Sequence, residues 1–159
     1  MERLWTPWRM EYILSDKEDE CIFCTKISEK RDADNFILER GKNTFALLNI
    51  YPYNSGHIMI APNRHVGSPM MMEEEEMMEL MRFVKMWEKR IRKVYEPQGL
   101  NIGANIGRSA GAGVIGHFHV HVVPRWTGDT SHMTVISNTK VIPQMLEESY
   151  RLLLSAIDS

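Results

Sequence analysis

The sequence predicts an α+β fold: an antiparallel β-sheet of about five strands, with one long helix and a C-terminal helix. Two observations predict it. Short apolar runs alternate with turn residues, and one long segment repeats apolar residues every three or four positions. The length of 159 residues suits one domain. Because no internal repeat or Gly/Ser-rich linker divides the chain, we expect a single domain over residues 1–159.

The first three strands are expected in the first half of the chain. Residues 36–39 and 44–50 are short apolar runs separated by a turn at 41–43, which is typical of a β-hairpin. A third run, 57–60, follows the turn residues 52–56. These runs predict an antiparallel meander.

The long helix is indicated by apolar residues at helical spacing. They are Met77, Leu80, Met81, Val84, Trp87, Ile91 and Val94. Acidic residues 73–76 lie in its first turns and basic residues lie toward its end, which matches the helix dipole, and Pro97 ends it. The methionines of this region could form an apolar partner-binding surface or pack in the core, and the flexible side chain of methionine adapts well to cores. We interpret Met70 to Met72, Met77, Met78 and Met81 as core-filling residues.

Two more strands and a closing helix are expected in the second half. Residues 99–106 and 118–123 have strand character and are joined by the glycine-rich segment 107–113. Residues 133–136 are a candidate short strand. Residues 141–157, with Pro143 near the start, predict the C-terminal helix.

The composition argues against large anionic partners. A net charge of −2 and a pI near 6.3 provide no global positive field for nucleic acid or anionic membranes. The sequence has no apolar run of membrane-spanning length, and residues 1–10 lack the apolar stretch of a signal peptide. We therefore expect a cytoplasmic protein without nucleic-acid or membrane partners, which binds any anionic ligand locally.

Three histidines alternate along the last predicted strand. His117, His119 and His121 share one face of that strand, because successive side chains of a strand point to opposite faces. The intervening apolar residues point to the other face: Phe118, Val120 and Val122. Clustered titratable residues of this kind indicate a functional site rather than a wall of hydrogen-bonded histidines.

A three-histidine catalytic zinc site is one alternative, since His-x-His on a strand is a known ligand arrangement. The loop before the strand favours a phosphate site instead. It carries Ser109, Gly111, Gly113 and Gly116, and glycines let backbone N–H groups surround a phosphate. Beside a neutral imidazole, this loop predicts a phosphate cradle next to a nucleophile.

The segment 117–123 resembles the His-φ-His-φ-His-φ-φ motif of the histidine-triad superfamily. Residues 45–49 and 56–62 are similar to the nucleoside-binding strands of that family, so the resemblance covers roughly residues 20–126. Three further segments resemble the branch related to Fhit and to bacterial diadenosine tetraphosphate phosphorylases. They are residues 4–10, 48–54 and 121–126.

The resemblance implies a catalytic role for each histidine of the triad. The middle histidine of the family, here His119, attacks the α-phosphate of a nucleotide and forms a covalent nucleotidyl-histidine. The backbone carbonyl of His117 would hold the other ring N–H of His119. His121 would bind phosphate oxygens or assist the leaving oxygen, while Ser109 and the loop amides would stabilise charge on the transferred group.

The resemblance also implies substrate-binding residues. Asn49 matches the residue that contacts the ribose, although an asparagine here also suits a turn. Phe45 and Leu47 would form the wall of a base pocket or, alternatively, pack in the core. Asn105 would face the phosphates, and Trp126 would stack over a second nucleoside.

A zinc site is implied beside the triad. Cys21 and Cys24 have the spacing of a metal-binding or redox pair in a reducing compartment. His65 and His117 stand where some triad proteins and galactose-1-phosphate uridylyltransferases bind zinc. Four such ligands make a closed structural site that would fix His117 and, through its carbonyl, His119. Relatives in this branch can lack the cysteine pair, so membership of the superfamily alone does not imply zinc.

The predicted function is hydrolysis or phosphorolysis of dinucleoside polyphosphates, with adenosine as the nucleoside. Alternatives are a nucleoside phosphoramidate or adenylyl-sulfate hydrolase and a nucleotide-binding signalling module. Galactose-1-phosphate uridylyl transfer fits less well, because those enzymes carry proline and glutamine at the positions of Phe118 and His121. The resemblance further implies a homodimer.

Overall fold

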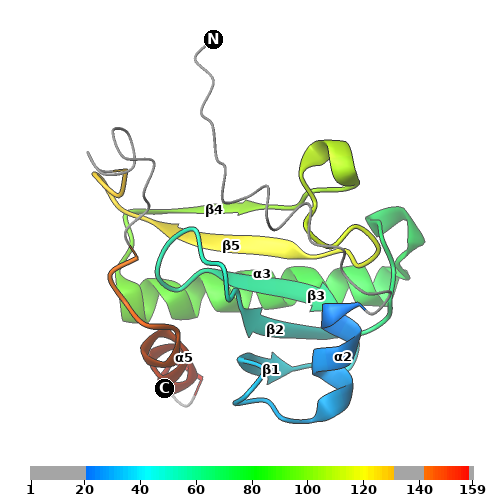
Figure 1. Cartoon of the computed structure of the whole chain (residues 1–159), viewed down its shortest axis with the longest axis horizontal. Helices are drawn as coiled ribbons and strands as arrows, with labels where there is room; N and C mark the ends of the chain where they lie inside the picture. The colour runs from blue at the N-terminus through cyan, green and yellow to red at the C-terminus, as the bar shows by residue number, and fades with distance from the viewer. Residues whose placement is uncertain (1–20, 131–141, 158–159) are drawn as a thin grey trace.

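The computed structural model describes residues 21–130 and 142–157; the expected strand at 133–136 and the motif at 4–10 lie outside them. The chain folds as an α+β protein, as predicted (Figure 1). Its helices and strands, in chain order, are α2 (Ile22–Glu29), β1 (Ile37–Arg40), β2 (Thr44–Leu48), β3 (Ile58–Pro62), α3 (Glu74–Tyr95), β4 (Gly99–Gly103), β5 (Val120–Arg125) and α5 (Leu146–Ser155). Short 3-10 turns lie at Pro69–Met71 and Arg108–Ala110.

The five strands form one antiparallel sheet in the order β1-β2-β3-β5-β4. The predicted meander of the first three strands is therefore confirmed. β5 lies between β3 and β4, and its residue His121 is opposite Met59 on one side and Gly103 on the other. Because β5 is paired on both sides, the face to which each of its side chains points is fixed by the ladder.

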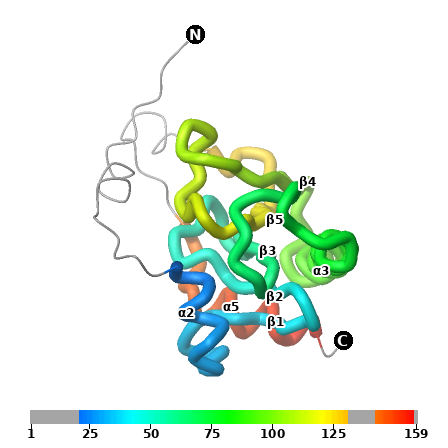
Figure 2. The backbone as a smooth tube through the Cα atoms, turned by 90° about the vertical axis from the view of Figure 1, so that its right-hand side faces the viewer, coloured from blue at the N-terminus to red at the C-terminus, as the bar shows by residue number. Residues whose placement is uncertain are grey.

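Helices cover both faces of the sheet. α3 packs on one face, where α5 joins it beside β1, and the short α2 lies on the other face. Figure 2 shows α2 and α3 on opposite sides of the strands. Phe118, Val120 and Val122 belong to the cluster under α3 and α5. The alternating histidines consequently project toward the side that α2 occupies.

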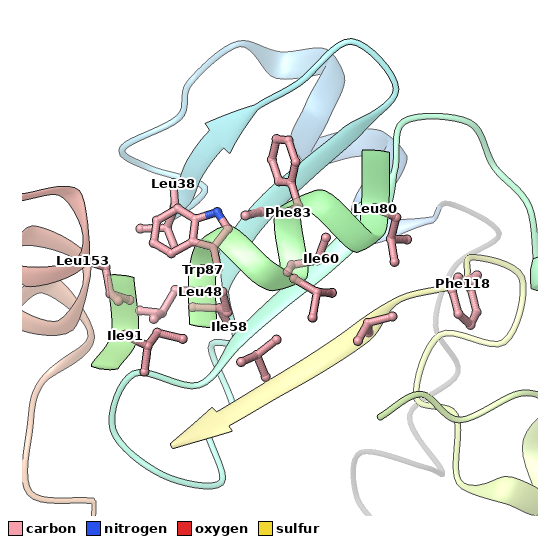
Figure 3. Packing of buried hydrophobic residues seen from close by; sticks show 14 residues of the cluster. Leu38, Leu48, Ile58, Ile60, Leu80, Phe83, Trp87, Ile91, Phe118 and Leu153 are labelled. Carbon is pink, nitrogen blue, oxygen red and sulfur yellow. The ribbon is translucent and has the colours of Figure 1, made fainter. Parts of the chain in front are cut away.

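The long helix α3 begins and ends where the sequence predicts. Glu73 and Glu76 form a reciprocal capping box at its start, and Glu96 ends it in the left-handed conformation just before Pro97. Its buried stripe includes Leu80, Val84, Trp87 and Ile91. Figure 3 shows Trp87 at the centre of this packing, among residues of the strands and of α5.

The interpretation of the methionines as core residues is wrong for most of them. Met70 is 90% exposed and Met81 is 57% exposed, and Met71, Met77 and Met78 are also exposed. Leu80, Phe83, Val84, Trp87 and Ile91 already fill the inward stripe of α3. Met78 and Met81 lie outside that stripe, whereas Met72 and Met86 pack partly against the core.

Two helical segments differ from the prediction. α5 begins at Leu146 rather than at 141, since Pro143 and Gln144 precede it in non-helical backbone and Met145 is its N-cap. α2 was not predicted, because it has only eight residues and Phe23 is its one fully buried side chain. Within residues 21–130 and 142–157, no helix combines the length and apolarity needed to cross a membrane.

We expect Trp87→Ala to lower the free energy of unfolding by about 3–5 kcal/mol, because it empties the centre of the main core. Met81→Ala, on the exposed side of the same helix, is the control and should change it by less than about 0.5 kcal/mol. Urea denaturation followed by circular dichroism measures both variants. Equal effects of the two substitutions would contradict this description of the core.

Candidate active site and metal site

The side chains of the histidine triad lie together on the α2 side of the sheet. His117 and His119 are buried and His121 is half-buried. The rings of His119 and His121 have centroids 4.9 Å apart. Phe23 of α2 packs against the triad, with its ring 5.1 Å from that of His117 and 5.0 Å from that of His119. Sequence analysis did not predict this contact, because it did not predict α2.

The ring of His119 is held in one tautomer. Its Nδ1 lies 2.9 Å from the backbone carbonyl oxygen of His117. A carbonyl oxygen only accepts, so Nδ1 carries the proton and Nε2 carries the lone pair of the neutral ring. Burial lowers the pKa of His119, although the bond to His117 acts in the opposite direction. His119 is therefore neutral near pH 7 and offers Nε2 as a nucleophile.

A fourth histidine, His57, sets the tautomer of His121. The backbone N–H of Tyr53 donates to His57 Nδ1 at 3.0 Å, so the proton of neutral His57 is on Nε2. This Nε2 lies 2.9 Å from His121 Nδ1, to which it donates. His121 Nδ1 therefore carries a lone pair, and its own ring proton is on Nε2. His119 and His121 thus carry opposite tautomers: one offers a lone pair at Nε2 and the other an N–H.

The environment keeps His57 uncharged. Burial, followed by the neighbouring His121 and His119, lowers the pKa of His57 to about 3. The ring lies 4.7 Å from that of Tyr53, measured between centroids. Reasoning from sequence included His57 only as the start of a strand. The signal that could have found it is a histidine directly before the strand that pairs with the histidine strand.

Four metal-ligating side chains converge next to the triad. Cys21, Cys24, His65 and His117 each offer an atom, and these atoms lie within 4.8 Å of one another. His117 Nδ1 is 3.3 Å from Cys21 Sγ and 3.6 Å from Cys24 Sγ, and His65 Nδ1 is 3.4 Å from Cys24 Sγ. Tetrahedral zinc, with bonds of about 2.3 Å to sulfur and about 2.0 Å to nitrogen, separates these atoms by about 3.5 Å.

The tautomer of His117 suits this arrangement. Its Nε2 donates to the carbonyl oxygen of Pro62 at 2.8 Å, so Nδ1 presents a lone pair to the sulfurs. Burial lowers the pKa of the His117 imidazole and raises the pKa of the Cys24 thiol. The four residues fit a metal ion, and His117 connects them to His119 through its carbonyl.

The residues expected around the nucleoside are more buried than their predicted roles require. Asn49 is only 8% exposed, and its Oδ1 accepts the Tyr51 N–H at 2.9 Å, as in a turn. Phe45 and Leu47 are buried in the cluster beneath α2. Contact of Asn49 with a ribose, and of Phe45 and Leu47 with a base, stay predictions.

The glycine loop joins β4 to the histidine strand. Ser109 lies in its exposed 3-10 turn, and the loop bends through positive φ angles of 80° at Gly107 and 85° at Gly111. Asn105 Nδ2 donates to the carbonyl oxygen of Gly111 at 3.3 Å. A Cβ atom at Gly116 would lie 3.0 Å from His65 Nε2, so the end of the loop lies against the metal-ligating cluster. Gly113, between these points, is exposed.

Trp126 is not brought to the triad. Its ring packs edge-on against Tyr95 at the end of α3, with centroids 6.2 Å apart. Residue 126 alternates with Val122 and Pro124 toward the α3 side of the sheet. Stacking of Trp126 on a second nucleoside receives no support from this position.

The buried His57 should make stability depend on pH. In the unfolded chain its pKa is 6.5, whereas folding lowers it to about 3. Above pH 6.5, where His57 is neutral in both states, the free energy of unfolding has its full value. It decreases as the pH falls below 6.5, because the unfolded chain then takes up a proton that the folded chain does not. Between about pH 7.5 and about pH 5, where carboxylates stay ionised, His57 should account for about 2 kcal/mol of the loss.

Denaturation at both pH values measures this effect. His57→Gln, which retains a hydrogen-bond acceptor and a donor, should reduce the difference by about that amount. An equal pH dependence in the parent and the variant would show that His57 titrates alike in the folded and unfolded chains.

Comparisons with known proteins show which family the chain belongs to. The profile of the family described as HIT domain matches residues 30–128. A Mycobacterium tuberculosis protein named AP-4-A phosphorylase is 42% identical over 96% of this chain and 83% of its own length. A Schizosaccharomyces pombe protein named bis(5'-nucleosyl)-tetraphosphatase (asymmetrical) is 30% identical over 63% of this chain and 54% of its own length.

Solved structures show the same fold. A histidine triad nucleotide-binding protein from Sulfolobus tokodaii is 31% identical, with a TM-score of 0.68, over 86% of this chain and 89% of that one. A Zn-bound histidine triad family protein from Mycobacterium smegmatis is 28% identical, with a TM-score of 0.71, over 87% and 94%. The match to the family profile and the identity to these relatives show that the chain belongs to the HIT domain family.

Proposed function

We propose that this chain cleaves dinucleoside polyphosphates at the α-phosphate, through a covalent nucleotidyl intermediate on His119. The observation that carries the proposal is the 2.9 Å bond between His119 Nδ1 and the carbonyl oxygen of His117. It leaves the Nε2 lone pair of a neutral, oriented imidazole available for attack. The names of the relatives, a phosphorylase of AP-4-A and a bis(5'-nucleosyl)-tetraphosphatase, support this class of substrate.

In the first step, His119 Nε2 forms a bond to the α-phosphorus. The bond between that phosphorus and its bridging oxygen breaks, and a nucleoside polyphosphate leaves with the electron pair. The N–H at His121 Nε2 donates a hydrogen bond to the phosphate oxygens, where negative charge develops. His57 sustains this role, because it occupies His121 Nδ1 and keeps the proton on Nε2.

In the second step, an oxygen of water or orthophosphate attacks the α-phosphorus and releases His119. Diadenosine tetraphosphate and phosphate would give ADP and ATP, whereas water would give AMP and ATP. The glycine loop would contribute Ser109 and the backbone amides of Gly111 and Gly113 to the phosphates, together with Asn105. Asn49 would contact the ribose.

We also propose that zinc is the metal held by Cys21, Cys24, His65 and His117. Two sulfur and two nitrogen ligands would complete a tetrahedral shell and leave no position for substrate, so the ion would have a structural role. The S···N separations support zinc. The ion would hold the imidazole of His117 from Nδ1 while Pro62 holds it from Nε2, and this fixes the carbonyl that orients His119.

Replacement of His119 by Asn should remove the nucleophile and lower turnover of diadenosine tetraphosphate by at least about 1,000-fold. Chromatography of the products, with and without phosphate, measures turnover and identifies the acceptor. Intact-mass spectrometry should detect one adenylyl group on the parent protein and none on the variant. Turnover by His119→Asn at the rate of the parent would overturn the assignment, and faster turnover of adenosine 5′-phosphoramidate or adenylyl sulfate would favour the alternative substrates.

Replacement of Cys24 by Ser should abolish stoichiometric zinc and lower thermal stability, because binding to a folded site stabilises that fold. Elemental analysis of protein produced in zinc-containing medium measures the metal. Ser28→Ala, an exposed substitution on the same helix, is the control and should retain the metal. A parent protein without zinc, or Cys24→Ser with as much zinc as the parent, would contradict the proposal.

A further inference from the structure

A cavity of about 350 Å³ opens beside His121, between β4, the end of β5 and the turn that carries Tyr53. Its wall includes Tyr53, Asn101, Asn105, His121, Val123 and Arg125. The mechanism above uses only His121 and Asn105 of this wall.

The cavity continues the histidine face of the sheet. His119, His121, Val123 and Arg125 alternate along one side of the same extended segment. Asn101 of β4 is opposite Val123, so its side chain shares that side. At a rise of about 3.3 Å per residue, Arg125 lies about 13 Å along the strand from His121. The cavity therefore begins at His121, whose ring centroid is 4.9 Å from that of His119, and leads away from both histidines.

The cation at the far end of the cavity is held rigidly. Arg125 donates through Nε and Nη2 to the carboxylate of Asp129, at 2.6 and 2.8 Å, and through Nη1 to Asn101 Oδ1, at 2.7 Å. Asp129 also accepts bonds from Asn54 Nδ2 and from the backbone N–H of Trp126. The bonds from Arg125 hold the pKa of Asp129 well below its usual range. The guanidinium group is thus preorganised before any ligand arrives.

The same contact orients the amide of Asn101. Since a guanidinium group only donates, the oxygen of Asn101 must face Arg125, and its NH₂ group must point elsewhere. Together with the N–H at His121 Nε2, the wall therefore carries N–H donors from three residues. Oriented donors and a fixed cation are the groups that recognise phosphate oxygens.

The chemistry of the two-step reaction indicates which ligands a cavity beside the triad has to bind. In an in-line displacement, the leaving oxygen departs from the side of the phosphorus opposite the nucleophile. His119 is the nucleophile, and in the second step it becomes the leaving group. The acceptor must therefore approach from the side through which the first product left. One subsite has to receive both groups in turn.

We propose that this cavity is the leaving-group and acceptor subsite. It holds the polyphosphate of the departing nucleotide in the first step and orthophosphate in the second, with Asn101, Arg125 and His121 as donors. Orthophosphate bound there attacks the α-phosphorus through one oxygen, the bond to His119 Nε2 breaks, and a nucleoside diphosphate results. The assignment rests on the proposed function and makes orthophosphate the acceptor, because water needs none of these contacts.

Asn101→Asp tests the subsite. The carboxylate still accepts from Arg125, so the fold is retained, but it replaces the NH₂ donor with negative charge that repels phosphate. The KM for orthophosphate should rise at least about tenfold, because an oriented donor becomes a like charge. The ratio of ADP to AMP formed from diadenosine tetraphosphate should fall with it.

Two controls isolate the effect. Lys85 is exposed on α3, across the sheet from the cavity. Lys85→Gln lowers the net charge by one unit, as Asn101→Asp does, and should leave the KM for phosphate unchanged. Adenosine 5′-phosphoramidate has a leaving group that carries no phosphate. Asn101→Asp should hydrolyse it within about threefold of the parent rate, which excludes damage to His119. Asn101→Ala, which only removes the donor, should raise the KM for phosphate by less than Asn101→Asp does.

The possible failures are distinguishable. If the parent forms no adenylyl adduct with either substrate, the proposed function is wrong. If the adduct forms but Asn101→Asp and Lys85→Gln share one KM for phosphate and one product ratio, only the subsite assignment is wrong. If the parent makes AMP rather than ADP in saturating phosphate, orthophosphate is not the acceptor and the proposal is overturned.

Discussion

The hydrogen bond from His119 Nδ1 to the carbonyl of His117 is the constraint on which the site depends. It selects one tautomer and one orientation of a ring that would otherwise rotate and exchange its proton. Three sets of contacts act on the two partners of this bond. Phe23 packs against both rings, while the carbonyl oxygen of Pro62 accepts a hydrogen bond from His117 Nε2. Cys21, Cys24 and His65 lie beside His117 Nδ1, on the other edge of that ring.

The triad is controlled by main-chain groups at both ends. The carbonyls of Pro62 and His117 accept ring protons at one end, and the N–H of Tyr53 donates to His57 at the other. Main-chain amides do not titrate near neutral pH, so the fold itself dictates which nitrogen carries each proton. Complementary tautomers on His119 and His121 follow from this arrangement.

The sequence predicts those features that repeat with a period. The stripe through Trp87 indicated α3, and the alternation from His117 to His121 indicated the shared face. What it missed depends on contacts between distant segments. α2 is too short to show a period, and the role of His57 arises from a turn and a neighbouring strand. The methionines were misjudged because Met70 and Met71 precede α3, and because an apolar residue next to the buried stripe, such as Met81, can still point to solvent.

The order of strands in the sheet has a consequence for folding. β1 to β3 close as one local unit, and β4 and β5 close as another through the glycine loop. The two units are joined by the pairing of β3 with β5. Next to this pairing, His57 is hydrogen-bonded to His121, 64 residues away in sequence. Because loop-closure entropy grows with sequence separation, we expect the pairing of β3 with β5 to be the last pairing of the sheet to form. The hydrogen bond between His57 and His121 therefore forms only once β3 and β5 have paired, and we expect the onset of activity during refolding to follow this pairing.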